Sequence, residues 1–197
     1  MTCLSTAEML SCTACSLHTS RNLVVPGHGN PDADIAFVAE APGFDEDMHG
    51  EPLIGPAGRR FDRHLAAVGL RREDCWLDNA VHCRPPDNRL RDYPDAQMRC
   101  PGLWLFPVLQ QVKPKVVVAM GRTAGSLWFP GIDAHGLSEL ARYTAEYTVI
   151  GALHPSYALR LGGEWNDADD SIVASIRRAR ALVDEGVTWL PTSTLQA

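Results

Sequence analysis

The sequence has no apolar stretch that approaches the roughly 20 residues needed to span a bilayer. Its start lacks a basic segment followed by an apolar one and so does not resemble a signal peptide. Long runs of one charge sign are absent and hydrophobic residues make up 45% of the 197 residues, which excludes global disorder. These absences predict a cytoplasmic protein without a membrane partner, a single domain over residues 1–197 with a tail at 186–197.

Lysine is almost absent, since Lys113 and Lys115 are the only two. The 24 acidic residues outnumber the 18 basic ones and give a net charge of −6 at pH 7, which argues against a protein that coats DNA through its overall charge. A local basic surface is still compatible with this total. Because nearly all the basic residues are arginines, contacts with phosphate are expected from arginines gathered at one site.

Cysteine, by contrast, is well represented, with six residues in the chain. In a cytoplasmic protein they are expected as thiols or metal ligands rather than disulfides. The spacing Cys12-x-x-Cys15 lets two thiols share one ion, but it also fits a redox pair. Together with Cys83 and Cys100, a four-thiol site suits zinc and an iron–sulfur cluster equally well.

Apolar runs alternate with helical patterns along the chain. The runs at 35–39, 75–81 and 115–121 predict buried strands, and 144–153 predicts a late strand or hairpin. Helices are expected at 56–68, 95–112, 123–129 and 167–185, the second divided by Pro101 and Pro107. This order predicts a three-layer α/β/α sandwich around a mostly parallel four-stranded sheet. Sites in such sheets form beyond the carboxyl ends of the strands, here in the loops 40–55, 79–89 and 154–160.

Short motifs occur in a fixed order through these loops and the cysteine segments. They are Cys12-x-x-Cys15, Val25-Pro26-Gly27-x-Gly29, Ala39-Glu40-Ala41-Pro42-Gly43 with Glu46-Asp47, Gly55-x-Ala57-Gly58, Asn79, Cys83-Arg84-Pro85-Pro86-x-Asn88-Arg89, Cys100 and His154-Pro155-Ser156. In this set the chain resembles the family-four uracil-DNA glycosylases over roughly residues 10–185. The resemblance implies a uracil-DNA glycosylase-like fold and a monofunctional hydrolase of base excision repair. It would remove uracil from single- or double-stranded DNA. A monomer is expected, because a single chain suits a protein that scans DNA.

The resemblance also implies a cofactor. The family carries a [4Fe–4S] cluster, whose ligands here would be Cys12, Cys15, Cys83 and Cys100. The remaining cysteines are interpreted as bystanders: Cys3 in a loose terminus, and Cys75 as a small buried side chain at the start of a strand.

Three polar residues of these motifs suit the chemistry of base removal. The amide of Asn79 offers an acceptor and a donor, complementary to N3–H and O4 of uracil and mismatched with cytosine. An N–H of His154 near O2 would stabilise the negative charge that grows on the leaving base. Glu40 would line the pocket with the backbone of 41–43 and help to place water, and the resemblance implicates it in activity.

Four further residues complete the predicted base pocket: Ala41, Gly43, Leu53 and Ser156. At Ala41 the related family-one enzymes place an aspartate that handles the water, and at Leu53 family members place a phenylalanine that stacks on the flipped base. These differences keep two alternatives open: a glycosylase for another deaminated base, hypoxanthine or xanthine, and a catalytically weak iron–sulfur protein that binds DNA. An electron-transfer protein would explain the cysteines alone.

Arginines gather around the expected mouth of the pocket: Arg59, Arg60, Arg63, Arg84, Arg89, Arg91, Arg99, Arg122 and Arg160. Four of them are predicted to bind the DNA: Arg59, Arg84, Arg89 and Arg160. Leu159, or else Tyr157, is placed to wedge into the gap that a flipped nucleotide leaves. The acidic residues Asp167, Asp169 and Asp170 are expected on a terminal helix away from this mouth.

Overall fold

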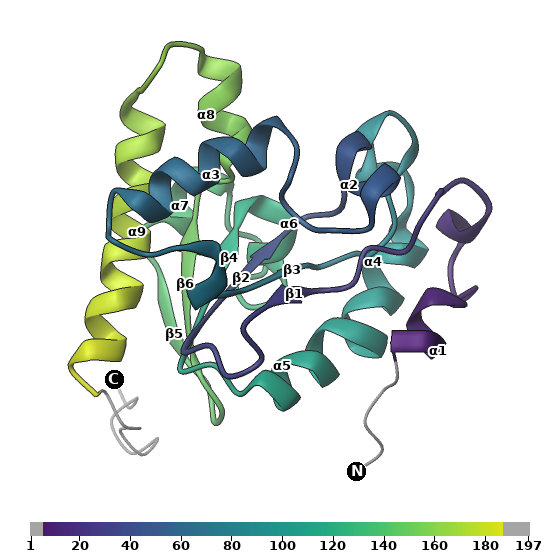
Figure 1. Cartoon of the computed structure of the whole chain (residues 1–197), viewed down its shortest axis with the longest axis horizontal. Coiled ribbons are helices and arrows are strands. Elements are labelled where there is room, and N and C mark those ends of the chain that lie inside the picture. Colours follow the sequence, from purple (N-terminus) through teal and green to yellow (C-terminus); the bar gives the residue numbers. More distant parts are fainter. Residues whose placement is uncertain (1–5, 187–197) are drawn as a thin grey trace.

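A six-stranded sheet runs through the part of the chain that this computed structural model describes, residues 6–186 (Figure 1). Its strands are β1 (His28–Gly29), β2 (Ile35–Ala39), β3 (Trp76–Asn79), β4 (Val116–Met120), β5 (Ala141–Tyr143) and β6 (Thr148–Ala152). They are ordered β1-β3-β2-β4-β6-β5. The four inner strands are parallel, and β1 and β5 pair antiparallel at the two edges.

The mostly parallel sheet is confirmed, but the prediction of four strands is wrong. The two additional strands are two and three residues long and lie at the edges. Strands this short have no apolar run or alternation in the sequence, so periodicity does not reveal them. The late strand expected within 144–153 is β6, and β5, which pairs with it, precedes that range.

Helices cover both faces of the sheet. The α-helices are α1 (Thr6–Leu10), α2 (Phe44–His49), α3 (Pro56–Ala66), α4 (Pro94–Cys100), α5 (Phe106–Val112), α6 (Gly121–Ser126), α7 (Ala134–Leu137), α8 (Pro155–Leu161) and α9 (Asp167–Asp184). Short 3₁₀ turns lie at η1 (Ser16–Thr19), η2 (Arg72–Asp74), η3 (Pro86–Asn88) and η4 (Leu90–Asp92), and a π-helical turn at η5 (Pro101–Leu105). None of these helices is long and apolar enough to cross a membrane.

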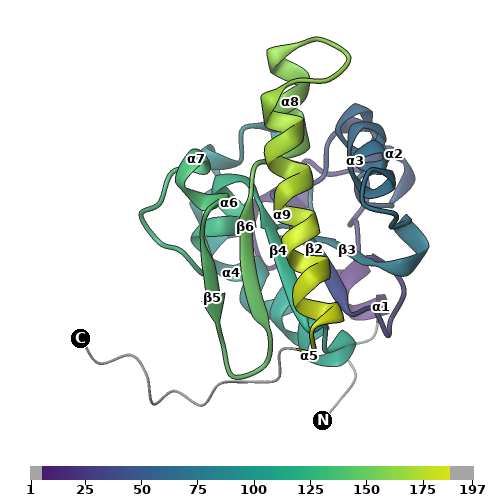
Figure 2. The same ribbon diagram turned by 90° about the vertical axis from the view of Figure 1, so that its left-hand side faces the viewer.

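The three layers follow from the alternation of side chains along each strand. Phe37 and Val118 point to the face covered by α3, α8 and α9, whereas Val38 and Val117 point to the face covered by α5 and α6. Figure 2 shows α9 crossing in front of the central strands. All of these strand residues are fully buried, which confirms the predicted sandwich.

The segment expected as one helix divided by prolines is α4, η5 and α5 in direct succession. Pro101 and Pro107 each stand at one of the first two positions of a new helical stretch, where the missing N–H matters least. The π-helical turn η5 begins at Pro101 and joins α4 to α5 without an intervening loop, so the chain stays helical from Pro94 to Val112.

Helix α9 corrects the expectation for one of the arginines. Arg60, expected at the mouth of the pocket, is 6% exposed, and it faces Asp169, which lies on the terminal helix as expected and is fully buried. Arg60 Nε donates to Asp169 Oδ1 over 2.7 Å, and His64 Nε2 lies 2.7 Å from the same oxygen. Arg60 and Asp169 therefore join α3 to α9 inside the protein, and Arg60 is unavailable for DNA.

Candidate active site and cysteine pocket

A cleft opens at the carboxyl ends of the parallel strands, where the sequence predicts a ligand site. Its walls come from the segments that follow β2, β3, β4 and β6, including α2 and the first residues of α3 and α8. The segment after β4 is not among the predicted site loops, but it contributes Gly121 and also Arg122, one of the arginines expected at the mouth. Eight predicted site residues line this one cleft: Glu40, Ala41, Gly43, Leu53, Asn79, His154, Ser156 and Arg160.

Asn79 is the last residue of β3 and is 2% exposed. Its backbone N–H donates to Asp78 Oδ1 over 2.8 Å, which fixes the end of the strand. Its side-chain Nδ2 has no hydrogen-bond partner in the described part of the chain. A buried polar group without a partner costs about 1–3 kcal/mol. This donor is therefore suited to a ligand atom that enters the cleft.

His154 lies just beyond the end of β6 and is the N-cap of α8. Its Nδ1 accepts the backbone N–H of Ser156 over 3.1 Å and lies 2.9 Å from Ser156 Oγ. Because that N–H occupies the lone pair of Nδ1, the neutral ring carries its proton on Nε2. Burial, helped by the charge of Arg160, lowers the pKa of His154 to about 4. At neutral pH the ring is an uncharged donor through Nε2.

Glu40, directly after β2, is held by a residue that the sequence analysis missed. Thr123 Oγ1 in α6 donates to Glu40 Oε2 over 2.6 Å. The bond joins the segments after β2 and β4 across the cleft, and it leaves Oε1 available to a second group. A threonine in the first turn of a helix belongs to no motif, so only the structure reveals this contact.

The loop between β2 and α3 is braced by Glu46, which is 7% exposed. Its carboxylate accepts the backbone N–H of Gly43 over 3.0 Å and that of Gly55 over 2.8 Å. Leu53 lies between these points, 5% exposed and with φ at +56°, and Gly58 packs against its carbonyl. A Cβ at Gly58 would stand 1.6 Å from that oxygen, so the motif requires glycine there.

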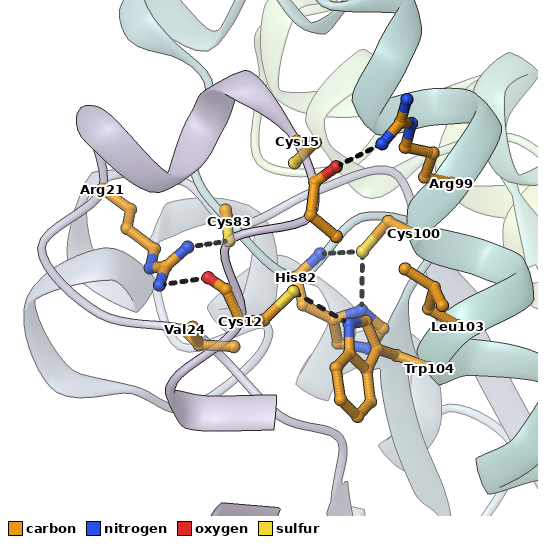
Figure 3. A pocket seen from close by; sticks show the side chains of 11 residues that line it. Cys12, Cys15, Arg21, Val24, His82, Cys83, Arg99, Cys100, Leu103 and Trp104 are labelled. Carbon is orange, nitrogen blue, oxygen red and sulfur yellow. Dashed lines mark hydrogen bonds between the residues drawn. The ribbon is translucent and has the colours of Figure 1, made fainter. Parts of the chain in front are cut away.

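The four cysteines predicted as ligands lie together in a second pocket, formed by the segment 12–24, the loop after β3 and the helical run α4–η5 (Figure 3). Cys12 and Cys15 come from the amino-terminal segment, Cys83 from the loop and Cys100 from the end of α4. Both Cys83 and Cys100 are buried, and Cys12 and Cys15 are half-buried. The structure thus gathers thiols that are up to 88 residues apart in sequence.

Hydrogen-bond donors surround these sulfurs. Arg21 Nη1 lies 3.5 Å from Cys83 Sγ, and Trp104 Nε1 lies 3.3 Å from Cys12 Sγ. Cys100 Sγ has two nitrogen neighbours, the backbone N and the ring Nδ1 of His82, at 3.4 and 3.3 Å. Such contacts stabilise negative charge on sulfur, which is the form in which cysteine binds metal.

The comparisons with known proteins agree with one another. The family described as "Uracil DNA glycosylase superfamily" matches residues 26–174. The chain belongs to this superfamily. The type-4 uracil-DNA glycosylase of Archaeoglobus fulgidus is 39% identical over 161 residues, which cover 77% of this chain and 80% of that protein. The type-4 uracil-DNA glycosylase of Thermotoga maritima is 37% identical over 176 residues, which cover 87% of this chain and 89% of that protein.

In this superfamily member, the four thiols of the cysteine pocket are ligands of the kind that zinc and iron–sulfur clusters take. No three His, Cys, Asp or Glu side chains among the described residues are arranged to hold a single metal ion. Burial raises the pKa of Cys83 to about 12 and also raises the pKa of Cys15. Without a cation these thiols stay protonated at neutral pH, so binding a metal centre would release protons. Cys75 is buried apart from the pocket, as predicted, and Cys3 lies outside the described residues.

Phe44, like Thr123, is a residue at the cleft that the sequence analysis missed. It stands at the start of α2, lines the cleft and is 60% exposed, which is unusual for so large an apolar ring. The guanidinium of Arg84 lies over the ring, 5.4 Å from its centre. Arg84, predicted to bind DNA, therefore reaches the rim of the cleft through Phe44.

The other residues predicted to bind DNA differ in their exposure, in their partners and in whether they line the cleft. Arg160 lines the cleft and donates to Ser156 Oγ over 3.2 Å. Arg59 is exposed on α3, and Arg89 pairs with Asp92 over 2.9 Å at the surface. Leu159 is 37% exposed but does not line the cleft, whereas Tyr157, the alternative wedge, does.

Proposed function

We propose that the chain is a monofunctional DNA glycosylase of base excision repair, which binds a flipped uracil in the cleft and hydrolyses its N-glycosidic bond. Membership of the superfamily and the two type-4 relatives support the reaction class. The single observation that carries the base assignment is the unpartnered Nδ2 of Asn79. A cytoplasmic location and a monomeric state stay predictions.

Base recognition rests on Asn79 at the end of β3. Its amide would donate from Nδ2 to uracil O4 and accept N3–H at Oδ1. Cytosine presents a donor at the first position and an acceptor at the second, so it would leave the amide mismatched. Ordered strand pairing and the bond from its N–H to Asp78 keep Asn79 in place for this discrimination.

Departure of the base rests on His154. When the N1–C1′ bond breaks, its electron pair passes to the uracil ring and negative charge grows on O2. A neutral imidazole can donate its Nε2–H to this oxygen and so stabilise the negative charge. The backbone N–H of Ser156 donates to Nδ1 and thereby fixes the tautomer that carries the proton on Nε2. The lowered pKa of His154 supports this neutral form.

The attacking water is assigned to Glu40. A water oxygen adds to C1′ as the base leaves, and one of its protons passes to the carboxylate or to solvent. Thr123 holds one carboxylate oxygen of Glu40, so the other is the acceptor that orients the water. Ala41, at the position where family-one enzymes carry an aspartate, has no polar atom beyond the backbone for this task.

Stacking on the flipped base is assigned to Phe44 together with Leu53. Leu53 is buried and aliphatic, so it supplies an apolar contact without an aromatic face. The exposed ring of Phe44, backed by Arg84, would supply the π-face at the cleft, where stacking is worth about 1–3 kcal/mol per base. Gly43 and Ser156 complete the pocket, and Arg59, Arg89, Arg160 and Leu159 are assigned to the DNA around it.

We assign a [4Fe–4S] cluster to the second pocket, with Cys12, Cys15, Cys83 and Cys100 as ligands. When bound, it supplies four iron–thiolate bonds that join the amino-terminal segment to the loop after β3 and to α4. Apolar packing among Leu17, Val24 and Leu90 surrounds the same pocket and supports a structural role.

The test is release of the base from oligonucleotides that carry uracil, hypoxanthine or xanthine, single-stranded and duplex, followed by alkaline cleavage of abasic sites. Uracil alone should be released, and Asn79→Ala should lose this activity while its thermal midpoint stays near that of the parent. Asn79→Asp tests the direction of the amide, because a carboxylate cannot donate to O4. Hypoxanthine or xanthine release would support the alternative substrates, and binding without any release would contradict the enzyme.

A further inference from the structure

Leu53 has an unusual backbone conformation for a residue of the base pocket. It lines the cleft, is 5% exposed and has φ at +56°. Residues with a bulky side chain adopt this region only where their surroundings hold them in it, and the residues that adopt it readily are glycine and asparagine. Contacts from other parts of the chain must therefore keep Leu53 in this conformation.

Helix α3 restricts the Leu53 carbonyl from one side. Gly58, in the first turn of α3, packs against this carbonyl so closely that a Cβ at position 58 would collide with its oxygen. The carbonyl therefore cannot turn further toward the helix without displacing backbone. This contact limits the peptide group after Leu53, but it does not hold the peptide group before it.

Arg72 holds both peptide groups. Its Nη1 donates to the backbone oxygen of Leu53 over 2.8 Å, and its Nη2 donates to the backbone oxygen of Pro52 over 2.8 Å. The oxygen of Pro52 belongs to the peptide plane before the Leu53 Cα, and the oxygen of Leu53 belongs to the plane after it. One rigid guanidinium bonded to both planes fixes φ and ψ of Leu53 together.

The guanidinium of Arg72 is itself anchored. It lies in η2, 19 residues beyond Leu53, and its side chain is 22% exposed. Nη1 also donates to Asp62 Oδ1 of α3 over 2.9 Å, and Nη2 lies 4.0 Å from Glu51 Oε1. The two carboxylates compensate its charge and keep the donors directed at the loop.

The preceding residue, Arg71, provides a matched comparison. Its side chain is 74% exposed, and its guanidinium pairs with Asp74, three residues along the chain. Both arginines therefore stand in the same turn and carry the same charge, but the hydrogen bonds to the loop carbonyls come from Arg72.

We propose that Arg72 is a positioning residue for the reaction: by fixing φ and ψ of Leu53, it presents the leucine side chain to the flipped base. This inference rests on the proposed function, because the base is the group that Leu53 would contact. A side chain that is already in place need not be ordered when the base enters, so the bonds from Arg72 increase affinity. The apolar contact exists before and during bond breakage, so its loss should weaken binding more than it slows the reaction.

The experiment measures single-turnover release of uracil from a short single-stranded oligonucleotide over a range of enzyme concentrations. Arg72→Met should raise the half-saturating concentration by about tenfold and change the maximal rate much less. Arg72→Lys should have a smaller effect in the same direction, because one ammonium nitrogen cannot reproduce the planar fork. Arg71→Met is the control and should match the parent in both quantities.

A Leu53→Gly background separates positioning of the side chain from general structural support. Glycine adopts the positive φ freely and has no side chain to present. Adding Arg72→Met to this background should therefore leave the half-saturating concentration of Leu53→Gly unchanged. A role in stability alone would lower the thermal midpoint in both backgrounds and raise the half-saturating concentration in neither.

Two results would overturn the inference: a half-saturating concentration of Arg72→Met equal to that of the parent, or the same rise in the parent and in the Leu53→Gly background. If Arg72→Met does not fold, Arg72→Lys decides by the same two criteria. A parent that releases no uracil overturns the proposed function and this inference with it. A parent that releases uracil while either of the two results is found overturns this inference alone.

Discussion

Only three residues of chain lie between Asn79 of the cleft and Cys83 of the cysteine pocket, yet the two sites differ in how their polar groups are paired. In the cleft, the buried Nδ2 of Asn79 has no partner among the described residues, and the neutral ring of His154 keeps its N–H on the nitrogen that Ser156 does not contact. In the cysteine pocket, Cys12, Cys83 and Cys100 already have nitrogen donors beside their sulfurs.

The difference indicates what each site is built to hold. Open hydrogen-bonding capacity suits a base that enters, reacts and leaves, because the ligand completes the pattern only while it is bound. Sulfurs with donors already in place suit a group that stays, because their negative charge is stabilised permanently. Changes in the cleft should therefore alter rates, and changes in the cysteine pocket should alter stability and iron content.

The largest effect on rate is expected from His154→Ala. Losing a donor to a developing oxyanion typically lowers a rate constant by about 10²–10³-fold. Single-turnover release of uracil should fall by this factor, while the thermal midpoint stays within a few degrees of the parent. His154→Gln, which can place an amide donor near the same position, should recover part of the rate. A loss of less than about fivefold in His154→Ala would remove His154 from the reaction.

The largest effect on stability is expected from Cys83→Ala. Loss of one ligand should release iron and lower the unfolding free energy by about 3 kcal/mol or more, since the cluster joins three separate segments. For a chain of this length that corresponds to a thermal midpoint about 6–12 °C lower. The matched control is Cys75→Ala, which removes a fully buried thiol outside the pocket and should keep the full iron content. Equal iron in both variants would exclude Cys83 as a ligand.

Sequence reasoning predicted the parts of the molecule that carry a pattern. Apolar runs gave the inner strands, and the ordered motifs gave eight residues that line one cleft and four thiols that line one pocket. It missed contacts made by residues that belong to no motif, such as the bond from Thr123 to Glu40. Arg60 shows why charge alone misleads: the same side chain that suits a phosphate is buried against Asp169, which no local pattern reveals.

A moderate effect is expected from Phe44→Ala. If the exposed ring stacks on a base, its loss should weaken binding of single-stranded uracil DNA by about tenfold, within the 1–3 kcal/mol that such stacking contributes. Phe44→Trp should restore the affinity. Met48→Ala changes another exposed apolar side chain of the same helix that does not line the cleft, and this variant should bind as the parent does. Equal affinity of all variants in a fluorescence anisotropy titration would leave Phe44 without a role in binding.

The smallest effect on the rate is expected from a change of pH, and a rate that does not vary with pH would itself support a neutral His154. Burial lowers the pKa of His154 to about 4, so the neutral donor is almost fully present from pH 8 down to pH 5. Single-turnover rates should show no titration of His154 in this range and should fall only as the pH approaches 4. Between about pH 6.5 and 4, His154 is protonated in the unfolded chain but not in the folded protein. Its contribution to the free energy of unfolding therefore decreases as the pH falls through this range. If the rate of the parent instead fell as the pH rose, with an apparent pKa of 6–7, and His154→Gln lost this dependence, the ring would act as a charged acid.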